Sequence, residues 1–204
     1  MFVLKVVYKI LALKLTILLN NYLIKSTFSF MNTDLQYPIG RAQLLDYSET
    51  TKNNCLKAIQ GLPIQLDYAV ENLNDTHLHT PYRDGGWTPN QIIHHLADSH
   101  MNAFIRFKLA ISEEQPTIKP YNQNSWAETA DVKDVPCNVS ITLIHSLHRR
   151  WIALLQTLSK EDFFKTFFHP EQNRNIELWE VLQYYAWHGK HHTTQITQLK
   201  ERIK

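Results

Sequence analysis

The sequence predicts an all-α protein built as a four-helix bundle, with a long crossover loop and a small β-hairpin. Three observations predict this class. Only 5 of the 204 residues are glycine, fewer than the ~7 % of average usage. Four long segments carry leucine and isoleucine throughout, and one long polar connection separates the second from the third. Four long helices with one long crossover connection are a known bundle arrangement.

Residues 1–30 precede these segments, and we expect them to be an N-terminal extension outside the functional domain. They contain four lysines and no acid, and their longest uncharged apolar run, "LTILLNNYLI", has ten residues. A membrane-spanning helix needs roughly 20 apolar residues, and a signal peptide would end in a small-residue cleavage site. A cationic surface helix is the alternative. Because Met31 begins an ordinary polar stretch, we expect an upstream mis-start and a domain spanning residues 31–204.

The four helices are predicted at about 47–74, 88–112, 139–158 and 175–204. Pro63 predicts a break or kink in the first helix, because proline removes a backbone donor. The second begins at Thr88, a favourable N-cap residue, and Pro89 follows at the first helical position. Aromatic residues alternate around a turn in "FFKTFFHPEQNRNIEL", residues 163–178, which predicts the hairpin.

Charge and cysteine content exclude some classes of function. The net charge is +2, but residues 1–30 contribute +4, so the other 174 residues sum to −2 from 17 basic and 19 acidic side chains. This balance gives the domain no electrostatic reason to bind nucleic acid. Cys55 and Cys137 stand far apart without a CxxC pattern. They fit a reduced, cytoplasmic protein in which both are buried apolar side chains rather than nucleophiles.

Three histidines cluster on the last predicted helix, in "AWHGKHHTTQI" at residues 186–196. Apolar or small residues recur along this helix at intervals of four and three, which predicts a core-facing stripe. His192 lies on the stripe, and His188 lies one turn earlier, near the edge of the stripe. His191 lies on another side of the helix, where it faces solvent or contacts the metal-binding residues without binding the metal. Two imidazoles at positions i and i+4 are able to bind one cation. The alternative is a pair of core histidines bonded to backbone carbonyls.

A third ligand would have to come from another helix, because a catalytic zinc site has three protein ligands plus water. The stretch "GWTPNQIIHHLADSH", residues 86–100, offers His94, His95 and His100. The apolar face of this helix centres nearest His100. Periodicity therefore leaves two possibilities open, in which His100 is either a ligand or a core histidine.

Five stretches together carry a family resemblance: "YPIG" (38–41), "PYRDGGWTPNQIIHHLADSHMNAFIRFKLA" (81–110), "PTIKPYNQNSWAE" (116–128), "LHRRWIALL" (147–155) and "YAWHGKHHTTQI" (185–196). Through them the chain from about Met31 onward resembles the DinB-like four-helix bundles, and specifically the YfiT group of metal-dependent hydrolases. The resemblance implies that the first ligand follows the tryptophan of the G-W-[ST] turn by eight positions, which gives His95. The closing H-x-x-x-H then gives His188 and His192.

The resemblance implies one divalent cation per subunit, Zn²⁺ with Ni²⁺ as the alternative, and a metal-dependent hydrolase that uses an activated water on a small-molecule substrate. Two other functions stay open: a bacillithiol-transferase-like, metal-dependent thiol S-transferase, and a non-catalytic metal-binding bundle. No general base is nominated. Asp98, one turn after His95, either orients that ring or is a solvated carboxylate. Arg106 and Lys108 either steer an anionic substrate or form a solvated face.

We further expect a homodimer without stable membrane insertion. The aromatic residues of 163–168 and the connection 113–138 offer surface that one bundle does not bury, and C₂ dimers are the commonest oligomers.

Overall fold

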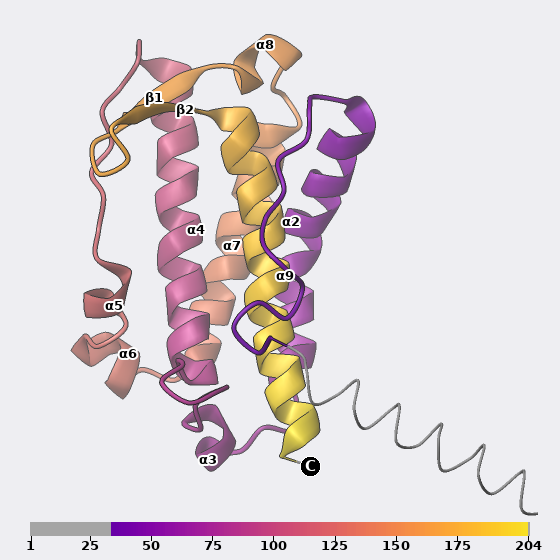
Figure 1. The fold of residues 1–204 in the computed structure, drawn as a ribbon, viewed down its shortest axis with the longest axis vertical. Helices are drawn as coiled ribbons and strands as arrows, with labels where there is room; N and C mark the ends of the chain where they lie inside the picture. Colours follow the sequence, from indigo (N-terminus) through magenta and orange to yellow (C-terminus); the bar gives the residue numbers. More distant parts are fainter. Residues whose placement is uncertain (1–33, 204) are drawn as a thin grey trace, which may run out of the picture. The chain divides into compact units, whose positions relative to one another are not determined.

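Four long helices dominate the computed structural model, which describes residues 34–203. They are α2 (Glu49–Val70), α4 (Pro89–Ser112), α7 (Cys137–Leu155) and α9 (Leu178–Arg202). Helix α2 contacts α7 and α9, and α4 contacts the same two helices, so α2 and α4 lie across the bundle from each other (Figure 1). The predicted four-helix bundle is confirmed. The expectation for residues 1–30 lies outside the described residues.

Local sequence signals explain where the helices begin. Helix α4 has a capping box, in which the Thr88 hydroxyl accepts a hydrogen bond from the Gln91 backbone N–H at 3.2 Å and the Gln91 side chain accepts one from the Thr88 N–H at 3.0 Å. Helix α2 continues through Pro63 rather than ending there. Helix α9 begins at Leu178, later than predicted, because Asn175 pairs with Phe168 in the hairpin.

The predicted hairpin is present and packs against one end of the bundle. Strand β1 (Thr166–His169) pairs antiparallel with β2 (Arg174–Glu177). Phe167 lies opposite Ile176, and both side chains are buried. Phe163, in the short helix α8 (Lys160–Phe163), is also buried. Two of the aromatic residues on which the homodimer prediction rests are therefore part of the core, and the homodimer stays a prediction.

Shorter helices lie in the connections. Helix α3 (Asp75–Leu78) lies between α2 and α4, while α5 (Gln123–Trp126) and α6 (Ala130–Asp134) lie in the long crossover connection between α4 and α7. Asn90 near the start of α4 donates to the Val132 carbonyl of α6 at 2.6 Å, which ties this connection to the bundle.

The core has two apolar clusters, one toward each end of the bundle. The cluster nearer the hairpin includes Phe107 and Trp151, and the other includes Leu66 and Ile144. His100 on α4 and His188, His191 and His192 on α9 fall between the two clusters in sequence. The bundle therefore carries a buried polar layer at mid-height, and buried polar groups in such a layer must bond to one another.

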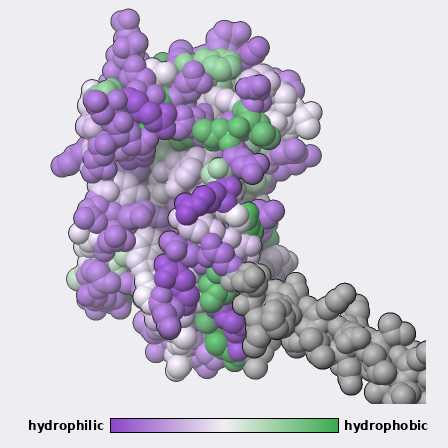
Figure 2. All heavy atoms as spheres, in the orientation of Figure 1, coloured by the Kyte–Doolittle hydropathy of each residue, from purple (hydrophilic) through white to green (hydrophobic). Residues whose placement is uncertain are grey.

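The surface in the orientation of Figure 1 is mostly hydrophilic, with smaller apolar areas near α8 and the start of α2 (Figure 2). No helix within residues 34–203 combines the length and the apolar character needed to cross a membrane. Cys55 and Cys137 are both buried free thiols, as predicted, and burial raises the pKa of the Cys55 thiol to about 11.

Candidate metal centre

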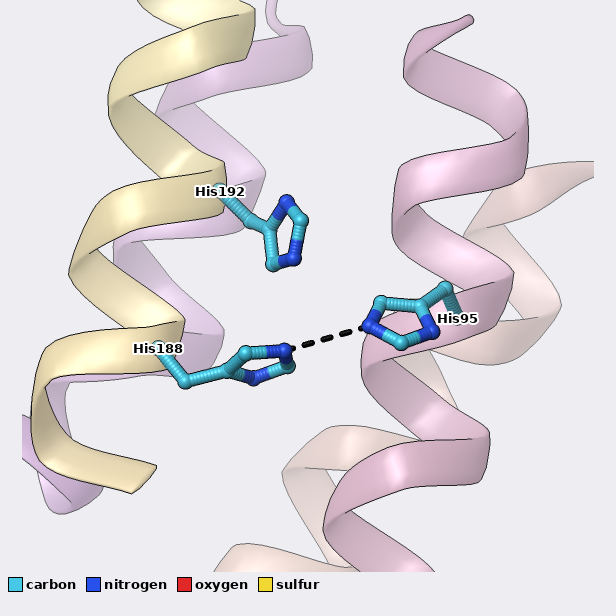
Figure 3. Close-up of side chains that lie close together, drawn as sticks. All are labelled: His95, His188 and His192. Atoms are coloured by element: carbon cyan, nitrogen blue, oxygen red, sulfur yellow. Dashed lines mark hydrogen bonds between the residues drawn. The ribbon is translucent and has the colours of Figure 1, made fainter. Parts of the chain in front are cut away.

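His95 from α4 meets His188 and His192 from α9 in the middle of the bundle (Figure 3). Each imidazole offers one ring nitrogen, and these three atoms all lie within 4.8 Å of one another. The Nε2 atoms of His95 and His188 are 3.1 Å apart. Two nitrogens bound tetrahedrally to one zinc ion would lie about 3.3 Å apart, given bond lengths of about 2.0–2.1 Å. The spacing of this pair therefore fits two ligands of one small cation, and the third donor lies within 4.8 Å of both.

The three rings are held in the neutral form that metal ligation requires. Burial lowers the pKa of His95 to about 4. Burial also lowers the pKa of His188 and of His192 well below the usual value, and the neighbouring histidines lower both further. A neutral imidazole has a free lone pair on one nitrogen, whereas a protonated one has none.

Gln195 fixes which nitrogen of His192 carries the proton. The Gln195 amide nitrogen faces the Gln36 carbonyl at 3.1 Å, and that carbonyl is able only to accept. The Gln195 carbonyl oxygen therefore faces His192 Nδ1, at 2.8 Å, and must accept a hydrogen bond from it. Because Nδ1 carries the proton, the lone pair of His192 is on Nε2. Sequence reasoning missed Gln195, although its position three residues after His192 places it on the same side of the helix.

Trp87 covers one side of the three histidines. Its ring centroid lies 4.7 Å from that of His95 and 6.2 Å from that of His192. The turn that carries it depends on Gly85, whose φ of +63° is a conformation that side chains with a Cβ rarely adopt. The glycine–tryptophan turn therefore places an apolar wall beside the cluster.

The other candidate histidines have different surroundings. His94 Nδ1 lies 2.8 Å from the Ser140 hydroxyl of α7, and His94 Nε2 lies 3.0 Å from the carbonyl of Val135, which follows α6. His100 is fully buried and bonds to His188 and His148 rather than joining the three-histidine cluster. His191 is buried, against the solvent-facing alternative, because Tyr37 of the N-terminal segment and Trp187 pack on its ring.

The polar residues considered near the site differ in their placement. No hydrogen bond within residues 34–203 joins the Asp98 carboxylate to His95, so the structure does not give Asp98 the orienting role considered for it. Burial, followed by the nearby Asp131 charge, raises the pKa of Asp98 to about 6. Lys108 is exposed and lies over the Phe104 ring. Trp126 packs on Tyr121, with ring centroids 4.3 Å apart.

Two cavities are lined in part by His188. The larger has a volume of about 640 Å³ and includes Arg106, Tyr121 and Tyr185 in its wall. The smaller, of about 310 Å³, includes Trp87 and His192. A small molecule in either cavity would touch a member of the histidine cluster.

Comparisons with known proteins identify the family and the fold of the chain. The family model for the DinB superfamily matches residues 40–196. A Bacillus cereus protein named "Putative metal-dependent hydrolase" is 47 % identical over 171 residues, covering 83 % of this chain and 98 % of its own length, and a Bacillus thuringiensis protein of the same description matches equally well. The solved structure of YfiT from Bacillus subtilis is described as "a probable metal-dependent hydrolase with an unusual four-helix bundle topology". It is 44 % identical, with a TM-score of 0.81, and the match covers 83 % of this chain and 98 % of that one.

Proposed function

Because the chain belongs to the DinB superfamily, we propose that it is a metal-dependent hydrolase in which His95, His188 and His192 bind one divalent cation, Zn²⁺. The observation that carries the proposal is the convergence of three buried or half-buried imidazole nitrogens within 4.8 Å. Three imidazoles without a carboxylate suit zinc or nickel and leave a coordination position for water or substrate.

A divalent cation bound there would lower the pKa of a bound water and polarise a carbonyl or phosphoryl oxygen. The chain's own residues supply orientation and hydrogen bonding. Ser99 donates to the Tyr185 hydroxyl at 3.3 Å, which leaves the Tyr185 proton free to point into the larger cavity. Burial raises the pKa of Tyr185, so this hydroxyl stays protonated at neutral pH. It is therefore suited to donate to a developing negative charge on a substrate oxygen.

An arginine in the larger cavity that has no acidic partner among the described residues favours a substrate with an anionic group. Arg106 lines this cavity and forms no ion pair with any carboxylate in residues 34–203. The other arginine of the lining, Arg174, is paired with Glu180, and the remaining acid, Glu171, is exposed. Arg106 is thus the arginine available to a ligand, and guanidinium groups bind carboxylates and phosphates well.

The activity is tested with zinc-loaded wild-type protein and pairs of esters and amides that differ by one carboxylate. We expect hydrolysis of the anionic member of a pair to be favoured. Arg106→Gln should raise its KM about 10–100-fold, the loss expected for a hydrogen bond to a charged group. Lys108→Gln, on the same helix but outside the cavity, is the matched control and should leave KM unchanged.

A parallel assay supplies a low-molecular-weight thiol and an electrophile. Turnover only in that assay would overturn the hydrolase and favour a thiol transferase. Bound zinc without turnover in either assay would mean a non-catalytic metal-binding bundle.

A further inference from the structure

A proline in helix α2 leaves a backbone carbonyl without its usual donor. In an α-helix the N–H of residue i+4 bonds to the carbonyl of residue i. Pro63 has no N–H, so it cannot bond to the carbonyl of Ile59. His148 from α7 takes this place, because its Nδ1 lies 2.6 Å from the Ile59 oxygen. Pro63 breaks a hydrogen bond of α2 without ending the helix, and His148 replaces that bond.

Three histidines continue from this carbonyl to the candidate metal centre. His148 Nε2 lies 3.0 Å from His100 Nδ1, and His100 Nε2 lies 3.3 Å from His188 Nδ1. All three rings are buried. Within residues 34–203 no carboxylate is hydrogen-bonded or ion-paired to any of them. Buried imidazoles without an acidic partner are neutral, and a neutral imidazole has one donor and one acceptor nitrogen.

The Ile59 carbonyl at one end and the neutrality of the three rings together fix the position of every proton along the chain of rings. The Ile59 carbonyl is able only to accept, so His148 carries its proton on Nδ1 and accepts at Nε2. His100 must then donate from Nδ1 and accept at Nε2. His188 must in turn donate from Nδ1, which leaves the lone pair of His188 on Nε2. This is the nitrogen that faces His95 (Figure 3).

We propose that His148 and His100 are positioning residues. Starting from the Ile59 carbonyl, each ring donates a hydrogen bond from Nδ1 to the preceding member, and this keeps His188 Nε2 unprotonated and ready to bind a metal. The relay, meaning Ile59 O, His148, His100 and His188, gives a role to His100 and His148, two buried histidines outside the three-histidine cluster. With the opposite polarity His188 would carry its proton on Nε2, and that proton would block ligation. The relay rests on the proposed function only in its last step, the binding of the cation.

The proton positions are tested on metal-free wild-type protein with nitrogen NMR of labelled histidine rings. We expect His148, His100 and His188 each to be protonated at Nδ1 and unprotonated at Nε2. A proton on His188 Nε2 would overturn the proposal. Because this spectrum needs no metal, it tests the relay even if the protein proves to bind none.

The effect on the metal is tested by zinc competition with a chelator. His148→Leu keeps the volume of a buried side chain but neither accepts from nor donates to its neighbours, and should weaken zinc binding about 10–100-fold. His148→Gln offers one donor and one acceptor in a similar arrangement and should recover most of the affinity. His145→Gln, on the same helix with its ring exposed and bonded to Asp67, is the matched control.

Equal zinc affinity in His148→Leu and wild type would overturn the relay. So would an equal loss in His148→Leu and His148→Gln when both variants remain folded. If wild-type protein binds no zinc while the Nδ1 protons are found as expected, the proposed function fails and the relay stands as a structural feature.

Discussion

Gly189 lies between His188 and His192 of α9, where this helix packs against Leu62 of α2. A Cβ atom added there would lie 2.7 Å from Leu62 Cδ2, 3.1 Å from Cδ1 and 3.3 Å from Cγ. Leu62 is buried, so its side chain has little room to move. Gly61 is the matched position, because it also lies inside a helix but a Cβ there would meet only Gln65 Nε2, at 3.4 Å.

The two glycines should therefore respond differently to alanine. Replacing glycine by alanine inside a helix stabilises it by about 0.5–1 kcal/mol, and we expect Gly61→Ala to gain this amount. Gly189→Ala gains the same propensity but overpacks the core, which costs about 1–3 kcal/mol. Its free energy of unfolding should therefore lie about 1–3 kcal/mol below that of Gly61→Ala.

Urea unfolding of both variants measures this difference, provided that the slope with denaturant is unchanged. Leu62→Ala removes the atoms that obstruct the new Cβ, although it costs about 2–5 kcal/mol by itself. On that background Gly189→Ala should no longer destabilise, which is a coupling expected only between residues in contact. If Gly189→Ala stabilises wild-type protein as much as Gly61→Ala does, the close packing of α2 on α9 is wrong.

Three further outcomes are expected. Thr88→Ala removes the hydroxyl that caps α4 and should cost about 1 kcal/mol, lowering Tm by about 2–4 °C in a thermal melt; an unchanged Tm would contradict the role of the cap. Because the pKa of Asp98 is raised from 3.8 to about 6, this carboxyl lowers stability as pH rises through that window, against the rise contributed by buried His95, whose pKa is lowered to about 4; in urea unfolding at a series of pH values the free energy of unfolding should therefore rise more steeply with pH in Asp98→Asn than in wild type, and equal slopes would contradict the prediction. Deleting residues 1–30 should leave thermal stability and bound metal unchanged, and aggregation of the truncated protein would refute this.

Helix positions were predictable from the sequence where local signals set them. Thr88 and Pro89 define the start of α4 by capping chemistry alone, and the structure begins the helix there. The start of α9 was less predictable, because Asn175 belongs to a strand through pairing with Phe168. The alternating aromatic residues predicted a hairpin over residues 163–178, but they did not show that its second strand extends to Glu177.

The site was predictable only in part. Helical spacing brought His188 and His192 together, but it did not choose between His95 and His100, because both are buried on the same helix. That choice depends on which neighbours the other helices bring, and His148 occupies the side that His100 faces. The burial of His191 could not be predicted from the sequence either, because it comes from Tyr37 in a distant segment of the chain.

The central claim is that three histidines bind one divalent cation together. The most direct test is elemental analysis of purified wild-type protein and of His95→Ala, His188→Ala and His192→Ala after equilibration with zinc. We expect about one equivalent in wild type and a sharp loss in each variant, because two imidazoles leave zinc undercoordinated. His145→Ala, the exposed control, should keep its metal. Full metal content in any one of the three variants, or none in folded wild-type protein, would contradict the claim.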